Sequence, residues 1–423
     1  MTLATPPIVG GGRIPADLLA CAHGAARHLA SLGVGPGARV AVDTHDVLPW
    51  FLGADLLGAA TLVVEPAWAP REREAVLADA APDVVVTGAA PSTTDGVEPA
   101  ESRCFYLPTT SGSSGRPKVL FRTRSSWLRS FEALGRFGPG EVLIPGPLSS
   151  SLFLFGALHA LWTDNSVRLL PKWEPFAAAE ASRTATAVHL VPSMLSALLA
   201  VLERRPGSAL RTVVCGGAQV DDALRARFAR VLPEAGLVEY YGSAEHSLIA
   251  IRRGGDGLRP VADVAVREGV LWVRSPMVFS GYLRDGVAHP VGAEWSTVDD
   301  LAELSDGVLT VFGRAGAVVS SGGKLVAAEE VEAVLRGARG VADVLVTGTP
   351  HPALGEVVTA VVEPGAGGVE LAALRAQARS GLEPGKRPRR WYVAKALPRT
   401  ASGKPARAVV AGQLADGTLE RLT

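Results

Sequence analysis

The sequence predicts an α/β protein with a large N-terminal domain of doubly wound, mostly parallel sheets, a small β subdomain and a small α+β C-terminal domain. Three observations carry this prediction. Apolar strand-like runs alternate with helical runs between residues 16 and 217, short strand-like runs separated by turns follow between residues 266 and 314, and the pattern changes again in the tail.

The first alternation lies at the N-terminus. The run ADLLACAHGAARHLASLG (16–33) repeats apolar positions at spacings of three and four and ends at Gly33, which predicts a helix. ARVAVDT (38–44) predicts a buried strand, and the pattern continues as helix 48–60, strand 61–66, helix 71–82 and strand 83–88. This order favours a parallel sheet with crossover helices.

Four more strands are predicted at EVLIPG (141–146), SVRLLP (166–171), AVHLVP (187–192) and RTVVCGG (211–217), with a helix over 192–205. VREGVLWVRSP (266–276) and VLTVFGR (308–314) are typical of short antiparallel strands. The segment 328–365 then predicts helix, strand, turn and strand. We therefore expect an N-terminal domain over residues 1–313 and a C-terminal domain over residues 314–423, with the boundary near Arg314.

Composition excludes several classes of protein. Lys plus Arg and Asp plus Glu are 42 each, so no net field favours nucleic acid or an anionic membrane. Cys21, Cys104 and Cys215 lack the spacing of a disulfide framework or a zinc site. The N-terminus has no signal-peptide pattern, and the longest apolar run, residues 151–162, is shorter than the roughly 20 residues of a bilayer span. We expect a cytoplasmic protein without membrane insertion.

The segment TTSGSSGRPK (109–118) is the first candidate for chemistry. Gly112 and Gly115 let backbone N–H groups converge, the hydroxyl residues add donors, and Lys118 adds a positive charge, so the segment suits phosphate oxygens. The spacing of a Walker loop is absent. A flexible surface loop is the alternative.

Three further segments have plain alternatives of their own. In VEYYGSAEHS (238–247), Tyr241 could stack on a purine and Glu245 could bind Mg2+. The alternative is that the segment is only the end of a strand and the turn that follows it. STVDDLAEL (296–304) suits a ribose clamp at Asp300, or a polar turn. LPRTASGKPAR (397–407) carries Lys404 in a polar loop that follows a basic run, and the plain alternative is a solvated basic surface.

In this order the four segments resemble those of the adenylate-forming superfamily, which includes acyl-CoA synthetases, peptide-synthetase adenylation domains and luciferases. The resemblance extends from GVGPGARVAV (33–42) to TASGKPAR (400–407) and is greatest to short bacterial acyl-CoA synthetases. It implies ATP and Mg2+ as cofactors, a mobile C-terminal domain, and CoA or a phosphopantetheinyl carrier protein as the thiol. The partners implied are a small carboxylic acid and CoA, or an acyl carrier protein.

The resemblance also implies roles for individual residues. Lys404 and Glu245 are the catalytic residues, Lys404 bridging carboxylate and α-phosphate and Glu245 holding the metal. The ATP site comprises Thr109, Thr110, Ser111, Gly112, Ser113, Ser114, Gly115, Lys118, Gly216, Gly217, Ala218, Glu239, Tyr240, Tyr241, Gly242, Ser243, Asp300 and Arg314. The acid pocket comprises Ser150, Phe153, His189, Val191, Gly216, Gly217 and Tyr240. The thiol channel comprises Ser321, Gly322, Gly323 and Lys386.

The sequence departs from the family pattern at several positions. Val119 and Asp299 replace usual glycines, Ala244 replaces a hydroxyl residue, Gly316 replaces a hinge Asp or Lys, and Ser149 with Ser150 replaces a histidine or aromatic gate. The lysine, the glutamate and the ribose aspartate are all present, so we expect activity.

The resemblance implies ATP-dependent activation of a carboxylic acid to an acyl-adenylate, followed by thioester formation with CoA. No aspartate in PGPLSSS (145–151) is available to pair an α-ammonium, so a fatty or aromatic acid is favoured over an α-amino acid. Two alternatives remain: an acyl-AMP ligase that loads a carrier protein, and a catalytically silent nucleotide-binding relative.

Overall fold

The structure of the chain is a computed structural model. It describes residues 15–68, 70–101, 104–110, 117–255, 257–292, 294–297, 299–314, 318–321, 324–352, 355–382, 384–399 and 405–423. Several predicted site residues lie outside this part of the chain, namely Ser111, Gly112, Ser113, Ser114, Gly115, Gly322, Gly323 and Lys404.

The chain divides into two compact units. The first comprises residues 1–264 and 273–295, and the second comprises residues 265–272 and 296–423. The division groups residues 296–314 with the C-terminal part of the chain, whereas the sequence places the boundary near Arg314. That boundary stays a prediction.

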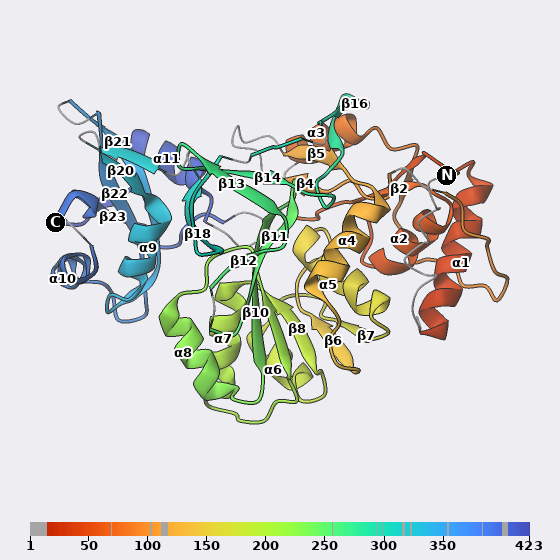
Figure 1. The fold of residues 1–423 in the computed structure, drawn as a ribbon, viewed down its shortest axis with the longest axis horizontal. Coiled ribbons are helices and arrows are strands. Elements are labelled where there is room, and N and C mark those ends of the chain that lie inside the picture. The colour runs from red at the N-terminus through yellow and green to blue at the C-terminus, as the bar shows by residue number, and fades with distance from the viewer. Residues whose placement is uncertain are drawn as a thin grey trace. The chain divides into compact units, whose positions relative to one another are not determined.

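The first unit follows the predicted alternation of helices and strands (Figure 1). Its elements are α1 Ala16–Ser31, β1 Arg39–Val42, α2 Val47–Leu56, β2 Ala60–Val63, α3 Pro70–Ala80, β3 Val84–Val86, β4 Thr109–Thr110, β5 Lys118–Phe121, α4 Arg124–Leu134, β6 Glu141–Ile144, α5 Ser151–Trp162, β7 Ser166–Leu169, α6 Pro175–Ala181, β8 Ala187–Leu190, α7 Pro192–Leu202, β9 Thr212–Cys215, α8 Asp222–Val231, β10 Gly236–Ser243, β11 Ser247–Arg253, β12 Arg259–Pro260, β15 Gly281–Arg284 and β16 Val287–Pro290. Helix α1 ends where Gly33 takes a φ of 85°, a left-handed conformation that suits glycine.

A seven-stranded sheet, in the order β12-β11-β10-β9-β8-β6-β7, is the centre of this unit. Strands β10, β9, β8, β6 and β7 are parallel, and β11 and β12 add antiparallel partners. Residues of α4 and α5 pack on one face in one apolar cluster, and residues of α6, α7 and α8 pack on the other face in a second cluster. The sheet is therefore covered on both sides, which confirms the predicted α/β fold class.

Two smaller sheets complete the first unit. Strands β2, β1 and β3 form a parallel sheet, as the alternation at the N-terminus predicts. Strands β16, β15, β5 and β4 form an antiparallel sheet that contains the described ends of the predicted phosphate-binding segment, Thr109–Thr110 and Lys118.

Strands β13 (Asp263–Arg267) and β14 (Val270–Arg274) lie where the chain passes between the units. They form a four-stranded sheet with β17 and β18, which agrees with the expected short antiparallel strands. The remaining elements of the second unit are β17 Asp300–Ser305, β18 Val308–Arg314, β19 Val318–Ser321, β20 Lys324–Ala327, α9 Ala328–Arg336, β21 Val341–His351, β22 Gly355–Pro364, α10 Leu371–Gly381, η3 Pro384–Lys386, β23 Arg390–Val393, α11 Arg407–Ala415 and β24 Glu420–Arg421.

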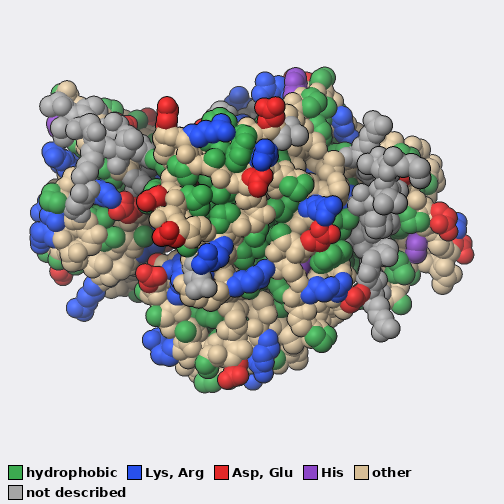
Figure 2. Space-filling view, viewed as in Figure 1, with side chains coloured by type: hydrophobic (Ala, Val, Ile, Leu, Met, Phe, Trp, Pro, Cys, Tyr) green, Lys and Arg blue, Asp and Glu red, His purple; other side chains and the backbone are tan. Residues whose placement is uncertain are grey.

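One face of the molecule illustrates the distribution of its charged side chains (Figure 2). On the face shown in Figure 2, acidic and basic side chains are interspersed, as the balanced composition predicts. No helix among the described residues combines the length and apolarity that a bilayer crossing requires.

Candidate active site

The carboxyl edge of the seven-stranded sheet brings predicted acid-pocket residues into one row. Leu190 of β8 pairs with Cys215 of β9, and Cys215 pairs with Glu239 of β10. The next residues are Val191 directly after β8, Gly216 directly after β9 and Tyr240 on β10, and the Gly216 N–H still donates to the Leu190 carbonyl at 3.2 Å. Since side chains alternate along a strand, these three positions share the face that α5 covers. Ligands of open α/β sheets bind at this edge.

Gly216 and Tyr240 approach each other closely within this row. A Cβ on Gly216 would lie 2.2 Å from the Tyr240 ring, so any other residue at position 216 would displace the ring. Burial raises the pKa of the Tyr240 phenol above its usual value, so the hydroxyl stays protonated. Gly217 follows with a φ of 83°, a conformation that again suits glycine.

Helix α5 contributes the rest of the predicted pocket on the same face. Phe153, in its first turn, is buried in the apolar cluster that includes Val214 and Val238, and its ring packs against Gly146. Ser150 is the N-cap residue of α5. His189 lies one row below Val191 on β8. The structure thus brings the predicted acid-pocket residues to one face and one edge of the sheet.

The predicted phosphate-binding segment is a β-hairpin as far as the described residues extend. Thr109 pairs with Val119 and Thr110 pairs with Lys118, so the ladder of β4 and β5 closes at the start of TTSGSSGRPK. The Lys118 ammonium lies 5.5 Å from the centre of the Tyr282 ring, a cation–π contact. Val119, which replaces a family glycine, is fully buried among Leu107, Leu283 and other apolar side chains.

Glu245 lies in the turn between β10 and β11. A bulge occurs at Tyr241 and Gly242, and the ladder closes at Ser243 and Ser247. A Cβ on Gly242 would lie 1.8 Å from the Ser247 carbonyl oxygen, so the turn requires glycine there. Glu245 is half-buried, and no cluster of three metal-ligating side chains occurs among the described residues.

Arg122 fixes this turn, and sequence analysis did not identify it. The guanidinium follows β5 directly, is 1% exposed, and donates to the carbonyls of Ala244, Glu245 and Met277. Burial lowers its pKa to about 10, so it stays charged at neutral pH. The strand that leads from the phosphate hairpin is thereby tied to the backbone of the predicted metal ligand.

The other residues of β10 divide between the two faces. Glu239 lies on the face opposite Tyr240, where Arg225 of α8 donates to both carboxylate oxygens at 2.8 and 2.9 Å. The Ser243 hydroxyl accepts from the backbone N–H of His246 at 3.0 Å and so holds the turn. Tyr241 is half-buried, and Ala218 is exposed beyond β9. Nucleotide contacts of these side chains stay predictions.

The predicted ribose residues meet in the second unit. Asp300, at the start of β17, pairs in the ladder with Arg314, the last residue of β18. Asp300 is buried, being 7% exposed. Asp299 has a φ of 60°, which explains why the family pattern carries glycine there and why an aspartate, which tolerates this conformation, can replace it.

The predicted thiol-channel residues that the structure describes lie in the second unit. Ser321 pairs with Lys324 where β19 meets β20. Lys386 donates to both carboxylate oxygens of Glu330, at 2.6 and 2.8 Å. The neighbouring Arg387 donates to the carbonyls of Leu382 and Arg379, so part of the basic run is engaged within the unit.

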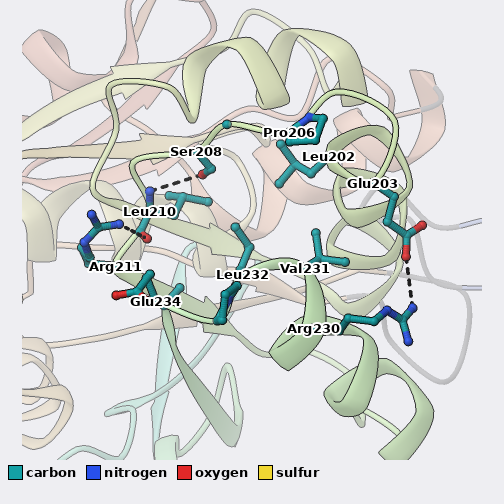
Figure 3. Close-up of a pocket in the computed structure, with 13 residues that line it drawn as sticks. Leu202, Glu203, Pro206, Ser208, Leu210, Arg211, Arg230, Val231, Leu232 and Glu234 are labelled. Carbon is teal, nitrogen blue, oxygen red and sulfur yellow. Dashed lines mark hydrogen bonds and ion pairs between the residues drawn. The ribbon is translucent and has the colours of Figure 1, made fainter.

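An open pocket of about 430 Å³ lies at the opposite, amino edge of the same sheet (Figure 3). Its lining comes from the ends of α7 and α8 and from the residues before β9 and β10. Glu203 pairs with Arg230 at 3.3 Å and with Arg227 at 2.7 Å, and Arg211 donates to the Leu210 carbonyl. Glu203, Arg211 and Arg230 thus have partners within the structure, and none of the predicted site residues lines the pocket.

Comparison with known proteins agrees with this geometry. The sequence matches the AMP-binding enzyme family over residues 16–104 and 87–283, and the AMP-binding enzyme C-terminal domain over residues 330–404. It is 30% identical over 414 residues to an uncharacterized acyl–CoA ligase of Bacillus subtilis, covering 86% of this chain and 85% of the relative. It is 31% identical to a feruloyl-CoA synthase of an Amycolatopsis species, covering 70% of this chain and 67% of that protein.

Solved structures with the same fold cover nearly the whole chain. The amide bond synthetase McbA from Marinactinospora thermotolerans matches with a TM-score of 0.84 and 25% identity, over 96% of this chain and 98% of that one. ATP-bound MatB from Rhodopseudomonas palustris matches with a TM-score of 0.79 and 22% identity, over 94% and 93% of the two chains. The chain therefore belongs to the AMP-binding enzymes of the adenylate-forming superfamily.

Proposed function

We propose that this protein is an AMP-forming acyl-CoA synthetase that acts on an uncharged fatty or aromatic acid. The observation that carries the proposal is the match to an acyl–CoA ligase over most of both chains. In the first step the acid carboxylate attacks the α-phosphorus of ATP and pyrophosphate leaves. In the second step the CoA thiolate attacks the acyl carbon, a thioester forms and AMP leaves.

The chain's own residues suit the first step. Strand β5, which follows the predicted phosphate-binding segment, is joined to the Glu245 turn through the Arg122 side chain. Glu245 fits the role of Mg2+ ligand, because it is a half-buried carboxylate and Mg2+ binds one or two carboxylates together with phosphate oxygens and water. When bound, Mg2+ would neutralise developing phosphate charge. Lys404 would supply the opposing charge at the carboxylate.

The acid pocket supports an uncharged substrate. The other side chains of its described lining are apolar, aromatic or hydroxylic. Its histidine, His189, carries no charge at neutral pH, because burial lowers its pKa to about 3. The resemblance to a feruloyl-CoA synthase supports an aromatic acid, and lower resemblance to putative long chain fatty acid–CoA ligases of staphylococci supports a fatty acid.

An amine is the second candidate acceptor. The fold matches an amide bond synthetase over 96% of this chain, and the cations Lys386 and Arg387 are engaged within the second unit. In that case an amine nitrogen would attack the acyl carbon of the adenylate and AMP would leave. A carrier-protein phosphopantetheine is the third acceptor that the chemistry allows.

Acid-dependent exchange of pyrophosphate into ATP, measured over a panel of carboxylic acids, tests the first step. A catalytically silent relative would show no exchange with any acid. Each active acid is then offered with free CoA, a phosphopantetheinyl carrier protein or an amine, and the product is identified by mass spectrometry. Absence of acyl-CoA for every activated acid would overturn the proposed acceptor.

The variant Lys404→Ala distinguishes the adenylation step from the thioester-forming step. We expect it to lose the exchange activity and to retain thioester formation from supplied acyl-adenylate. Equal loss of both steps would contradict the role proposed for Lys404.

A further inference from the structure

The described residues on either side of the Lys404 segment (residues 400–404) meet at a closed base. Arg399 and Pro405 form an isolated antiparallel bridge across this base. The Ala406 N–H donates to the Pro398 carbonyl at 2.7 Å and adds a second link. Because Lys404 is joined directly to Pro405, the groups that hold the base also set where the lysine side chain starts.

Arg399 holds the first side of the base by contacting two carboxylates at once. Its Nη2 lies 2.9 Å from the Asp343 carboxylate and 3.3 Å from the Glu363 carboxylate. Asp343 of β21 and Glu363 of β22 are directly opposite each other in the ladder. Like charges at such positions repel unless a cation neutralises them. The two strands thus present an acidic site that Arg399 occupies.

Arg407 holds the other side of the base at a more buried carboxylate. It donates to Glu332 of α9 at 2.8 Å and to the Val346 carbonyl of β21. Glu332 is 5% exposed and also accepts from the Val346 N–H at 2.8 Å. Burial raises the pKa of the Glu332 carboxyl, and the positive charge of Arg407 opposes this shift. Arg407 thereby links the second side of the base to α9 and β21.

Apolar packing and the two arginines hold the base in different ways. Leu397 before the segment and Val410 after it are both buried in one apolar cluster. The hydrophobic effect is non-directional, whereas hydrogen bonds between charged groups fix geometry. We therefore expect loss of the Arg399 contacts to leave the second unit folded and to alter the orientation of the base.

We propose that Arg399 and Arg407 are positioning residues for Lys404, and that adenylation depends on them whereas thioester formation does not. The inference rests on the proposed function, in which Lys404 acts in the first step. A lysine ammonium lies at the end of a flexible four-carbon stem, so its placement requires a fixed backbone. A displacement of about 1 Å in a reacting group can lower the rate by about 100-fold.

The test separates the two steps with variants of the more exposed arginine. We expect Arg399→Met to lower kcat/KM for pyrophosphate exchange by about 10–100-fold and to change thioester formation from supplied acyl-adenylate by less than about twofold. Arg399→Lys is expected to recover most of the exchange activity. One nitrogen of Arg399 makes both contacts, and a single ammonium can replace it.

Arg336 provides a matched control. It contacts one carboxylate from each side of the base, Glu332 at 3.5 Å and Asp343 at 3.2 Å, but it belongs to α9. Its side chain is 41% exposed, close to the 36% of Arg399. Arg336→Met is expected to leave both steps unchanged. Equal losses of exchange in Arg336→Met and Arg399→Met, or an equal loss of both steps in Arg399→Met, would overturn the inference.

Arg407 is tested by a substitution that keeps its charge, because the buried Glu332 would otherwise lose its partner. Two nitrogens of Arg407 make separate contacts, with Glu332 and with the Val346 carbonyl, and one ammonium does not reproduce that geometry. Arg407→Lys is therefore expected to lower exchange several-fold while thioester formation is retained. Unchanged exchange would overturn the role proposed for Arg407.

A measurement without turnover keeps this inference separate from the proposed function. Hydrogen–deuterium exchange of the Ala406 amide, which donates across the base, is compared among the wild-type protein, Arg399→Met and Arg336→Met. We expect several-fold faster deuterium uptake in Arg399→Met alone. If the wild-type protein exchanges pyrophosphate with no acid, the proposed function fails and the amide comparison decides this inference. Equal uptake in all three proteins would overturn it.

Discussion

The two edges of the seven-stranded sheet differ in what they leave available to a ligand. The amino edge has the open pocket of Figure 3, but its Glu203 and Arg230 are paired with each other. The carboxyl edge has Gly216 without a side chain and a glutamate turn whose carbonyls accept from the Arg122 side chain, and one row inside the edge His189 has both nitrogens unsatisfied among the described residues. A hollow alone therefore does not indicate function, whereas polar groups kept without internal partners do.

The largest expected effect concerns the two buried arginines that flank Thr123. Arg124 donates to Asp55 of α2 at 2.7 Å, and both side chains are almost fully buried. Arg124→Met leaves that carboxylate unpaired and is expected to lower the free energy of unfolding by about 3–5 kcal/mol. Arg122→Met leaves backbone carbonyls unpaired, at about 1–3 kcal/mol for each.

Arg122 contacts the Glu245 turn at the carboxyl edge of the sheet, whereas Arg124 contacts Asp55 of α2. We expect Arg122→Met to raise the Mg2+ concentration needed for half-maximal exchange, and Arg124→Met to leave that concentration unchanged once the folded fraction is corrected for. Chemical denaturation and Mg2+ titrations measure the two effects. An identical Mg2+ requirement in both variants would show that Arg122 has only a folding role.

The second effect compares one glutamate from each edge. Glu245→Gln is expected to reduce pyrophosphate exchange by about 10²–10³-fold, because it removes a charged ligand from a site where phosphate charge develops. Glu203→Gln, at the amino edge, is expected to leave kcat/KM nearly unchanged. Loss of exchange in Glu203→Gln would break the contrast between the edges.

The third effect is the dependence of stability on pH. Burial lowers the pKa of His159 and of His246 to about 4, and that of His189 to about 3. Nearby positive charges lower the first two pKa values further: Arg136 and Arg253 act on His159, and Arg122 acts on His246. In the unfolded chain a histidine takes up a proton near pH 6.5, whereas these buried histidines stay neutral until the pH is much lower. The free energy of unfolding is therefore unaffected by them above pH 6.5 and decreases as the pH is lowered below 6.5. Each is expected to cost about 2 kcal/mol at pH 5.

Denaturation curves at pH 7 and pH 5 measure this loss, and His246→Gln is expected to reduce it. The lining of the amino-edge pocket contains no histidine among its described residues, so Glu203→Gln should leave the difference between the two pH values almost unchanged. A pH difference that His246→Gln does not alter would argue against a neutral buried His246.

The smallest expected effect is at the amino edge. Arg230 is largely exposed, so its pair with Glu203 is screened by solvent. Arg230→Ala is expected to change the free energy of unfolding by at most about 1 kcal/mol and to leave exchange activity intact. A larger loss of activity would indicate that this pocket takes part in the reaction.

Local patterns predicted most elements of the fold. Alternating apolar runs located the strands β1, β2, β3, β6, β7, β8 and β9, and glycine marked the end of α1 at Gly33. The role of Arg122 had no local signal, because an arginine in a polar segment is usually exposed. Its contacts with Ala244 and Met277 join residues more than 120 positions apart.

The departures at Asp299 and Val119 show the same division. From sequence alone they are losses of glycine at a nucleotide motif. The φ of 60° at Asp299 and the full burial of Val119 give each a structural reason. A backbone conformation and a packing environment depend on which strands meet, and composition does not contain that information.

The sequence by itself determined the order of helices and strands, the family resemblance and the residue types available for adenylate chemistry, because these depend on spacing along the chain. Tertiary structure decided which of those residues share a face. Strand register put Val191, Gly216 and Tyr240 in one row with His189 beneath them, and it put Glu239 on the other side against Arg225. The physical reason is that hydrogen bonding between strands fixes register, and a shift of one residue would exchange the two faces.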